Sequence, residues 1–326
     1  MKIAVLGAGA WGTALARLLA QRGHAVALWD FFPETLDLIR RTGRNERYLP
    51  GIELPETIRP ETDARAAVAG AELVVVASVS KAFRETTRVL ESFSGIVVSV
   101  TKGIEFATGK TMTQVLQETA PRAVPVAMSG PTLALEVARG IPTAIVAASA
   151  DAAAARAAQR LFHGTTFRVY TSADVLGVEL GGALKNVIAI GAGVCDGLGF
   201  GDNSKAALVT RGVVEMRRLG VACGAQAETF NGLSGLGDLM VTCFSRLSRN
   251  RGFGERLGRG EKAADIVNTM TAVAEGYPTA RAAHQLARRL AVMTPIMDEV
   301  YAMLYEGKDV RQAVNDLMSR ESKPED

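Results

Sequence analysis

Two lysines are the residues of this 326-residue chain best suited to acid–base chemistry. Lys185 lies in the segment VELGGALKNVIAIGAG, which predicts a buried helix. Burial lowers the pKa of a lysine because it disfavours the charged form, and such a group can exchange a proton near neutral pH. The alternative is a lysine whose ammonium reaches solvent along the helix. Lys102, in SVTKGIE, directly follows a predicted strand, where it could meet a substrate oxygen or be an ordinary loop lysine.

Other segments carry residues that could hold an anion. In SGPTLALEVARGIPTA, a Gly-Pro pair at Gly130 predicts a shaped loop that places Thr132 at or near a helix N-cap. There the Thr132 hydroxyl could bind an anion or a cofactor amide, or simply cap its own helix. Arg249 and Asn250 offer a guanidinium and an amide to a phosphate, although basic loops are usually just solvated. Asp238, in a glycine-rich stretch, could accept hydrogen bonds from hydroxyls of the same ligand.

A glycine loop near the N-terminus has the pattern of a dinucleotide-binding site. The sequence GAGAWG follows the apolar run at 3–6 and opens a predicted helix, and Asp30 closes the next apolar run. In this pattern Gly7 permits a tight turn, Gly9 lets the backbone approach a pyrophosphate, and Gly12 allows close helix packing. The helix N-terminus offers N–H groups to the phosphates, and Asp30 would bind the ribose 2′-hydroxyl. The sequence therefore predicts a bound dinucleotide cofactor.

Short apolar runs predict the elements that position these residues. Such runs lie at 3–6, 25–29, 73–77, 96–100, 124–128 and 144–148. They are typical of parallel strands buried on both faces, which predicts a doubly wound Rossmann-type α/β sheet with ligands at the carboxyl ends of its strands. From about residue 151 the sequence becomes alanine-rich, and after FRVYTSAD it is helical throughout.

This change of pattern predicts two domains. Residues 1–171 would form the dinucleotide-binding domain, and residues 172–326 an all-α substrate and catalytic domain. The charged, apolar-poor tail from Ser319 onward is expected to fray.

Charge and hydropathy argue against nucleic-acid or membrane partners. The chain has 37 Lys+Arg against 34 Asp+Glu, a net charge of +3, which is too balanced to indicate either kind of binding surface. The apolar N-terminus imitates a secretory signal, but its glycines occupy the positions that the dinucleotide pattern requires. No uncharged apolar run is long enough to span a bilayer.

The cysteines and histidines predict a reducing, metal-free protein. The three cysteines lack the paired spacing of a disulfide framework or zinc site, which favours the cytoplasm. The histidines lie far apart without carboxylates or cysteines at ligand spacing, so we expect surface or packing roles for them and no metal. These residues are Cys195, Cys223, Cys243, His24, His163 and His284.

Taken together, the motifs resemble those of the bacterial type of NAD(P)-dependent glycerol-3-phosphate dehydrogenases. The match covers nearly the whole chain, in the order GAGAWGTALA, TKG, SGPT with ALEVARGIPTA, ALKNVIAIGAGVCDGLGFGDNSKAALVTRG, GLSGLGDLMVTC, SRNRGFG and VAEG. The resemblance implies reversible reduction of dihydroxyacetone phosphate to sn-glycerol 3-phosphate, the precursor of the phospholipid backbone. It also implies a homodimer formed through the helical domain.

The resemblance assigns roles to individual residues. Lys185 matches the proton-exchanging lysine, and Lys102 and Asn186 match residues that hold and polarise the reacting oxygen. A second ammonium near Lys185 would depress its pKa. Asp238 and Thr242 match positions that face hydroxyls. The other substrate positions are Arg249 and Asn250 as the phosphate clamp, with Gly130, Thr132 and Ser248. The matching cofactor positions are Ala10, Trp11, Ala134, Val273 and Glu275. Lys102 and Arg249 are expected to contact the cofactor as well as the substrate.

The residues after the second strand predict the cofactor preference. Members of the family that favour NADP often carry a basic residue here, whereas this chain reads Trp29, Asp30, Phe31, Phe32. Asp30 would repel a 2′-phosphate, and neither phenylalanine can pair with one. We therefore predict that NAD(H) is preferred and NADP(H) is possible, with Phe31 a candidate for stacking on adenine.

Two other functions remain open at this point. A β-hydroxyacid dehydrogenase of the 6-phosphogluconate dehydrogenase type also places a lysine on a helix behind a Rossmann domain, but its substrates carry a carboxylate, whereas SRNRGFG favours a phosphate. A sensor that binds NAD(H) without turnover would have little use for Lys102, Lys185 and Asp238 near the nicotinamide. Turnover with the triose phosphate separates the sensor from the enzyme.

Overall fold

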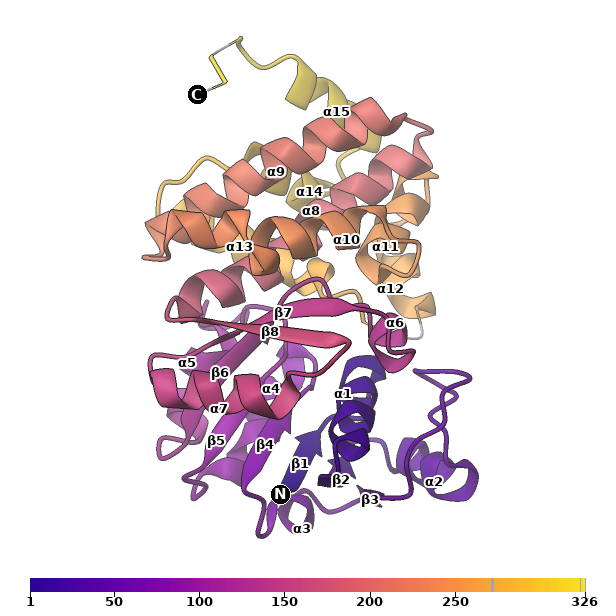
Figure 1. Cartoon of the computed structure of the whole chain (residues 1–326). Coiled ribbons are helices and arrows are strands. Elements are labelled where there is room, and N and C mark those ends of the chain that lie inside the picture. Colours follow the sequence, from indigo (N-terminus) through magenta and orange to yellow (C-terminus); the bar gives the residue numbers. More distant parts are fainter. Residues whose placement is uncertain (271–272, 323, 326) are drawn as a thin grey trace.

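An eight-stranded sheet organises the N-terminal half of the chain, with the strand order β3-β2-β1-β4-β5-β6-β7-β8 (Figure 1). The computed structural model describes residues 1–270, 273–322 and 324–325. Strands β1 to β6 are parallel, which confirms the predicted doubly wound sheet. The strands are β1 (Lys2–Leu6), β2 (Ala25–Trp29), β3 (Ile58–Glu61), β4 (Leu73–Val76), β5 (Ile96–Ser99), β6 (Val124–Ser129), β7 (Thr143–Ala148) and β8 (Phe167–Ser172).

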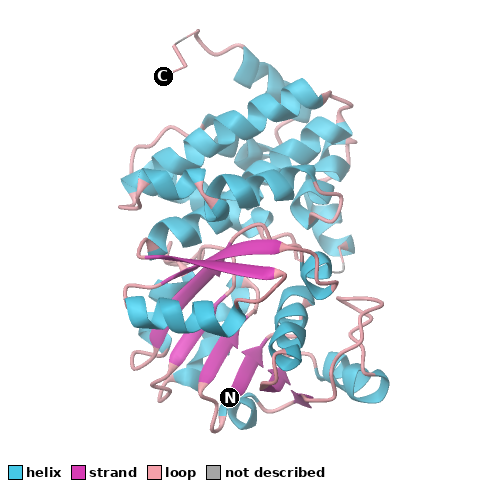
Figure 2. Cartoon of the chain, in the orientation of Figure 1, coloured by secondary structure: helices cyan, strands magenta, loops and turns pink. Residues whose placement is uncertain are grey.

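The last two strands depart from the predicted parallel arrangement. The run at 144–148 belongs to β7, which pairs antiparallel with β6, while β8 is parallel to β7 (Figure 2). Helix α6 (Ala134–Ala138) lies between β6 and β7 and packs against α1 (Ala10–Gln21) near the edge where β6 ends. The chain therefore re-enters the sheet from that edge and runs back along β6.

Two strands, β3 and β8, received no assignment from the sequence. Both lie at an edge of the sheet and are buried on one side at most. The β3 sequence, IRPE, contains a proline and two charged residues, which an edge strand tolerates but a central strand does not. Their weak apolar pattern is therefore a consequence of their position.

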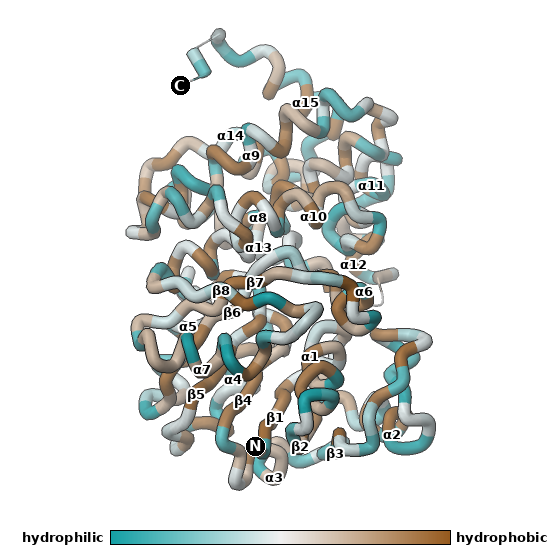
Figure 3. Tube along the Cα trace, viewed as in Figure 1, coloured by the Kyte–Doolittle hydropathy of each residue, from teal (hydrophilic) through white to brown (hydrophobic). Residues whose placement is uncertain are grey.

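Alternate residues of each strand pack on opposite faces of the sheet. Ile3 and Val5 contribute to a core that includes α1 and α7, and Ala4 and Leu6 to one beneath α4 and α5. Figure 3 shows hydrophobic residues along the central strands. The helices of this half not bounded above are α2 (Pro33–Thr42), α3 (Ala64–Val68), α4 (Phe83–Thr87), α5 (Met112–Thr119) and α7 (Ala152–Phe162), with short 3₁₀ turns at Ser80–Ala82 and Arg88–Leu90.

The C-terminal half is helical and surrounds one long helix, α8 (Val175–Gly197). Helix α8 is long and apolar enough to cross a bilayer, but 89% of its most apolar window is buried inside the protein, so it is the core helix of this half. The surrounding helices are α9 (Asp202–Ala222), α10 (Asp238–Phe244), α11 (Arg249–Gly258), α12 (Ala263–Thr269), α13 (Gly276–Arg289), α14 (Pro295–Tyr301) and α15 (Val310–Met318). Of the tail expected to fray, residues 323 and 326 lie outside the described residues.

Helices α8 and α11 approach each other through glycines. A Cβ at Gly254 would lie 1.9 Å from the Ile190 carbonyl oxygen, and one at Gly193 would lie 2.0 Å from that of Arg251. These distances leave no room for a methyl group. The glycines therefore bring α11, whose first turn holds Arg249 and Asn250, against the helix that carries Lys185.

We expect Gly254→Ala to lower the free energy of unfolding by about 3 kcal/mol, because the helices must separate to admit the methyl group. Gly252→Ala is the matched control on the same helix. Its Cβ meets nothing within 4 Å among the described residues, so the better helix propensity of alanine should raise stability by up to about 1 kcal/mol. Urea unfolding of the two variants measures both effects, and equal stabilities would contradict the packing account.

Candidate active site

The glycine loop has the shape that a dinucleotide requires. Gly7 has a φ of +115°, and a Cβ there would lie 2.8 Å from the Ala77 backbone. A Cβ at Gly12 would lie 1.9 Å from the Gly7 carbonyl oxygen. By contrast, a Cβ at Gly9 would meet nothing within 4 Å in the described part of the chain. Space therefore lies beside the Gly9 backbone, where the pattern places a pyrophosphate.

Helix α1 begins beside this space and supplies hydrogen-bond donors to it. Gly9 is the N-cap residue and has no side chain to satisfy the first amides, and the amides of Ala10, Trp11 and Gly12 have no acceptor within the helix. These N–H groups and the positive end of the helix dipole suit a phosphate. The residues present thus fit a dinucleotide cofactor.

Asp30 and Asn45 hold the glycine loop from two sides. Asp30 Oδ2 accepts a hydrogen bond of 2.6 Å from the Ala8 amide, and Asp30 Oδ1 accepts one of 2.9 Å from Phe32. The Asn45 amide donates to the Ala8 carbonyl at 2.7 Å. Burial raises the pKa of Asp30, while the backbone hydrogen bonds oppose the rise. Phe31 is 76% exposed and therefore accessible to an adenine ring.

A single buried carboxylate joins the two candidate lysines. Lys185 Nζ donates to Asp238 Oδ1 at 2.8 Å, and Lys102 Nζ donates to Asp238 Oδ2 at 2.6 Å. Asp238 is 1% exposed and Lys185 6% exposed, so Lys185 does not extend its ammonium to solvent. The three residues come from the loop after β5, from α8 and from the start of α10. The structure therefore brings together side chains from both halves of the chain.

The surroundings of Lys185 set its proton affinity. The pKa of Lys185 is lowered to about 8, mainly by burial and also by the Lys102 ammonium, while the Asp238 carboxylate opposes the fall. The predicted influence of a second ammonium has the expected direction, but burial is the larger cause. A lysine with a pKa near 8 can donate and accept a proton close to physiological pH.

The two lysines differ in how many of their donors are used. Lys102 also donates to the Gly130 carbonyl at 2.9 Å and to the Thr132 hydroxyl at 3.3 Å, so all three of its donors have acceptors. Lys185 donates to Asp238 and, at 2.6 Å, to the Thr242 hydroxyl. An ammonium has three donors, so one donor of Lys185 has no acceptor among the described residues. Lys185 is thus the lysine that can still donate to a substrate.

Thr132 lies near the helix N-cap, as expected, but it is not the N-cap residue itself. Helix α6 begins at Ala134 with Leu133 as its N-cap, and its five residues are fewer than two turns. The Thr132 hydroxyl donates instead to the Gly130 carbonyl at 3.0 Å and accepts a hydrogen bond from Lys102. The reason is local, because the Gly130 backbone has a φ of +156° and delays the helix. Thr132 therefore helps to orient Lys102.

The residues of the expected phosphate clamp lie next to this group. Asn250 donates from its amide to Asn186 Oδ1 at 2.8 Å and accepts from the Gly276 amide at 2.8 Å, so it connects α8, α11 and α13. Ser248 caps α11 by accepting a hydrogen bond from the Arg251 amide. Arg249 is exposed in the first turn of α11. The Asn250 and Ser248 side chains thus have hydrogen-bond partners in the protein, and the Arg249 guanidinium is close enough to interact electrostatically with the Glu275 carboxylate.

Glu275 ties the start of α13 to the sheet. Its carboxylate accepts hydrogen bonds from the Ser80 amide at 2.9 Å and the Ser80 hydroxyl at 2.6 Å. Burial raises the pKa of Glu275, and the hydrogen bonds from Ser80 oppose the rise. A Cβ at Gly103 would lie 2.5 Å from the Ser80 Cβ, so the loops after β4 and β5 meet here. Val273, another expected cofactor residue, is 48% exposed nearby in sequence.

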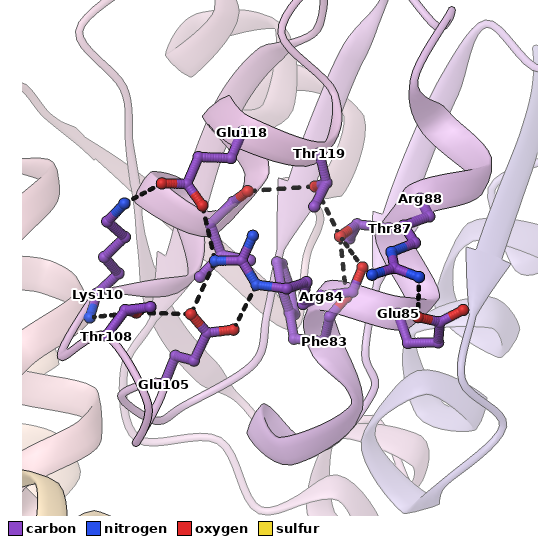
Figure 4. A network of polar contacts seen from close by, with 11 residues as sticks. Phe83, Arg84, Glu85, Thr87, Arg88, Glu105, Thr108, Lys110, Glu118 and Thr119 are labelled. Carbon is purple, nitrogen blue, oxygen red and sulfur yellow. Dashed lines mark hydrogen bonds and ion pairs between the residues drawn. The ribbon is translucent and has the colours of Figure 1, made fainter.

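An ion-pair network fixes the loop that follows Lys102 (Figure 4). Arg84 makes two parallel hydrogen bonds of 2.8 Å to the Glu105 carboxylate and an ion pair of 2.7 Å with Glu118. Glu118 also pairs with Lys110 at the far end of the loop. Bidentate arginine–carboxylate pairs have defined geometry, so the network restricts the backbone three residues after Lys102.

Several residues that shape the site were not identified from the sequence. Asn45, Ser80, Arg84 and Glu105 act through partners that are distant in sequence, at separations between 21 and 195 residues. For Ser80 the signal was its position shortly after the predicted strand at 73–77, in ASVSK. Among the described residues, no group of three or more His, Cys, Asp or Glu side chains is arranged to hold a metal ion.

Comparisons with known proteins agree with this geometry. The family models described as "NAD-dependent glycerol-3-phosphate dehydrogenase N-terminus" and "C-terminus" match residues 2–155 and 174–315. The chain is 50% identical to "Glycerol-3-phosphate dehydrogenase [NAD(P)+]" of Moorella thermoacetica, over 98% of this chain and 96% of the relative. It is 49% identical to the protein of the same name from Chlorobium limicola, over 100% of this chain and 99% of the relative.

A solved structure of the same family has the same fold over nearly the whole chain. The crystal structure of glycerol-3-phosphate dehydrogenase from Coxiella burnetii superposes with a TM-score of 0.94 at 38% identity, covering 98% of each chain. The resemblance noted in the sequence motifs is therefore confirmed. The family matches also favour this family over the 6-phosphogluconate dehydrogenase alternative. By sequence and by structure, this chain belongs to the NAD-dependent glycerol-3-phosphate dehydrogenase family.

Proposed function

We propose that this protein reversibly reduces dihydroxyacetone phosphate to sn-glycerol 3-phosphate with NAD(P)H. The observation that carries the proposal is the Lys102–Asp238–Lys185 group, in which one buried carboxylate holds two ammoniums and Lys185 keeps one unused donor. Reduction of a ketone needs a proton donor at the carbonyl oxygen, and Lys185 meets that need. Family membership supports the choice of substrate.

The side chains around the Asp238 carboxylate have different roles in proton transfer. A bound nicotinamide cofactor supplies or accepts the hydride at C2 of the substrate. Lys185 donates its proton to the carbonyl oxygen in the reducing direction and takes it back in the oxidising direction. Lys102 adds a second positive charge, which stabilises the negative charge that develops on that oxygen. Thr242 and Asp238 orient the Lys185 ammonium so that its remaining N–H is directed to the substrate.

The substrate's other end requires a cation. Arg249, an exposed residue in the first turn of α11, carries a guanidinium, which suits a phosphate. Asn186 follows Lys185 and Asn250 follows Arg249, and the hydrogen bond between the two asparagines fixes α11 against α8. Ser248, Gly130 and Thr132 complete the substrate wall in this proposal. The distance between the phosphate and the reacting carbon would then be set by the α8–α11 packing.

The cofactor site is assigned to the glycine loop and the segments around it. The pyrophosphate would lie at Gly9 and the first amides of α1, and the adenosine ribose at Asp30. NAD(H) is preferred because Asp30 disfavours a 2′-phosphate. Ala134, Val273, Glu275 and the neighbouring cations Lys102 and Arg249 complete the cofactor residues of the proposal.

The proposal extends to the cellular compartment, the domain boundary and the partners of the protein. Three unpaired cysteines, Cys195, Cys223 and Cys243, suit a reducing cytoplasm. We place the boundary between the domains at residues 171 and 172, which is supported by the end of β8 at Ser172 and the start of α8 at Val175. The protein would act as a homodimer without nucleic-acid or membrane partners, and its product would enter phospholipid synthesis.

The test is a spectrophotometric assay with dihydroxyacetone phosphate as acceptor. We expect the absorbance of NADH to fall rapidly, and that of NADPH to fall more slowly at equal concentration. Equal catalytic efficiencies would overturn the cofactor preference but not the reaction. Protein that binds NADH but turns over with neither cofactor would instead support the sensor alternative.

A further inference from the structure

A short segment after α2 is fastened to the glycine loop at both of its ends. The Asn45 amide donates to the Ala8 carbonyl at 2.7 Å and to the Thr13 hydroxyl at 2.8 Å, and Asn45 is fully buried. Four residues later, Leu49 is 1% exposed and packs in a small core with Ala14 of α1. The residues between Asn45 and Leu49 are therefore held beside the loop that binds the cofactor in the proposed function.

Arg47 is the cation in this fastened segment. Its guanidinium carbon lies 5.2 Å from the centre of the Tyr48 ring and 5.9 Å from that of Phe32. Phe32 lies three residues after the end of β2 and donates its amide to Asp30. Cation–π contacts with two rings restrict the position of a guanidinium and use none of its hydrogen-bond donors. Arg47 is thus an oriented cation next to the residue expected to face the ribose.

Arg47 is also available to an anion. It forms no ion pair within 4.0 Å in the described part of the chain, whereas Arg44, three residues earlier, pairs with Glu53 at 2.5 Å and Glu46 at 4.0 Å. Asp30, the carboxylate on which Arg47 acts electrostatically, accepts hydrogen bonds from backbone amides on both of its oxygens. The Arg47 charge is close enough to lower the pKa of Asp30, although burial raises that pKa more.

We infer that Arg47 binds the 2′-phosphate of NADP(H) and so allows the protein to accept this cofactor in spite of Asp30. The inference rests on the proposed cofactor site at the glycine loop. An arginine near the ribose accommodates the 2′-phosphate in dinucleotide-binding folds. Here the arginine does not follow β2 in the chain but reaches that place from a separate segment. Asp30 disfavours the added phosphate and Arg47 stabilises it. Both cofactors therefore bind, and the affinity for NAD(H) is the higher.

Nucleotide binding tests the inference without turnover. Adenosine 2′,5′-bisphosphate and AMP are titrated calorimetrically into the full-length protein, and NADPH and NADH are titrated by fluorescence. We expect Arg47→Gln to lower the affinities for adenosine 2′,5′-bisphosphate and NADPH by about 10- to 50-fold, since a hydrogen bond to a charged group is lost. The affinities for AMP and NADH should change by less than about 3-fold. The NADPH affinity of the wild type should fall more steeply with salt than that of the variant.

A matched variant controls for the loss of charge. Arg44→Gln removes the same charge from the same segment, but from a guanidinium already paired with Glu53, and should leave the NADPH-to-NADH affinity ratio unchanged. An unchanged ratio in Arg47→Gln would overturn the inference, as would an equal loss for both cofactors. If the wild type binds these nucleotides but does not reduce dihydroxyacetone phosphate, the proposed reaction is wrong. The role of Arg47 is still tested separately by the NADPH-to-NADH affinity ratio.

Discussion

Replacing Lys185 with methionine should lower kcat for dihydroxyacetone phosphate reduction by about 10²- to 10⁴-fold, the usual contribution of a general acid. Methionine fills a similar volume without a proton to donate. The substrate oxygen would then receive hydride with no proton donor beside it, since the donors of Lys102 already have acceptors. Affinity for NADH should stay within about 3-fold, because Lys185 is not among the proposed cofactor contacts.

The measurement combines steady-state kinetics with NADH binding by fluorescence. Lys205→Met is a suitable control, because Lys205 is also buried in the helical half and pairs with a carboxylate, Asp196. That variant should lose stability and retain kcat per folded molecule. Normal turnover in Lys185→Met would remove Lys185 from the mechanism. A loss of NADH binding together with turnover would point to misfolding.

Asp238→Asn should move the pH dependence of reduction to lower pH. The Lys185 pKa is about 8 in the protein, and Asp238 is the group that raises it against burial and Lys102. Protonated Lys185 is the donor, so kcat/KM for reduction falls as pH rises through the pKa of this lysine. Without the carboxylate charge that pKa drops, and the fall in kcat/KM should occur at least about one pH unit lower. The oxidising direction, which needs neutral Lys185, should gain its activity at correspondingly lower pH.

The same substitution should also reduce stability, because it leaves the buried Lys185 ammonium and the half-buried Lys102 ammonium without their shared carboxylate. Removing one partner of a buried ion pair typically costs about 3–5 kcal/mol. Asp196→Asn provides the comparison, since Asp196 likewise bridges two cations, Lys205 and Arg251, but away from the Lys185 group. We expect Asp196→Asn to lower Tm and to leave the pH profile in place. A profile that stays fixed in Asp238→Asn, or moves to higher pH, would contradict the assigned role of the carboxylate.

The fold could be predicted from the sequence wherever the signal is local. Patterns of a few residues predict the glycine loop, the central strands and the long apolar helix around Lys185. Central parallel strands are buried on both faces and must be apolar, so β1, β2, β4, β5 and β6 were visible. The edge strands β3 and β8 lack this constraint and were missed.

The sequence by itself determined the residue types that the proposed chemistry needs, the dinucleotide pattern and the family. Only the tertiary structure decided which of them meet. It brought Lys102, Asp238 and Lys185 together across 136 and 53 residues of chain, and left just Lys185 with a donor to spare. It turned β7 antiparallel, and it carried Arg47 to the end of β2, where the sequence offers only aromatic residues after the acid. The physical reason is that periodicity and turn chemistry act over a few residues, whereas the distance between two side chains depends on how whole elements pack.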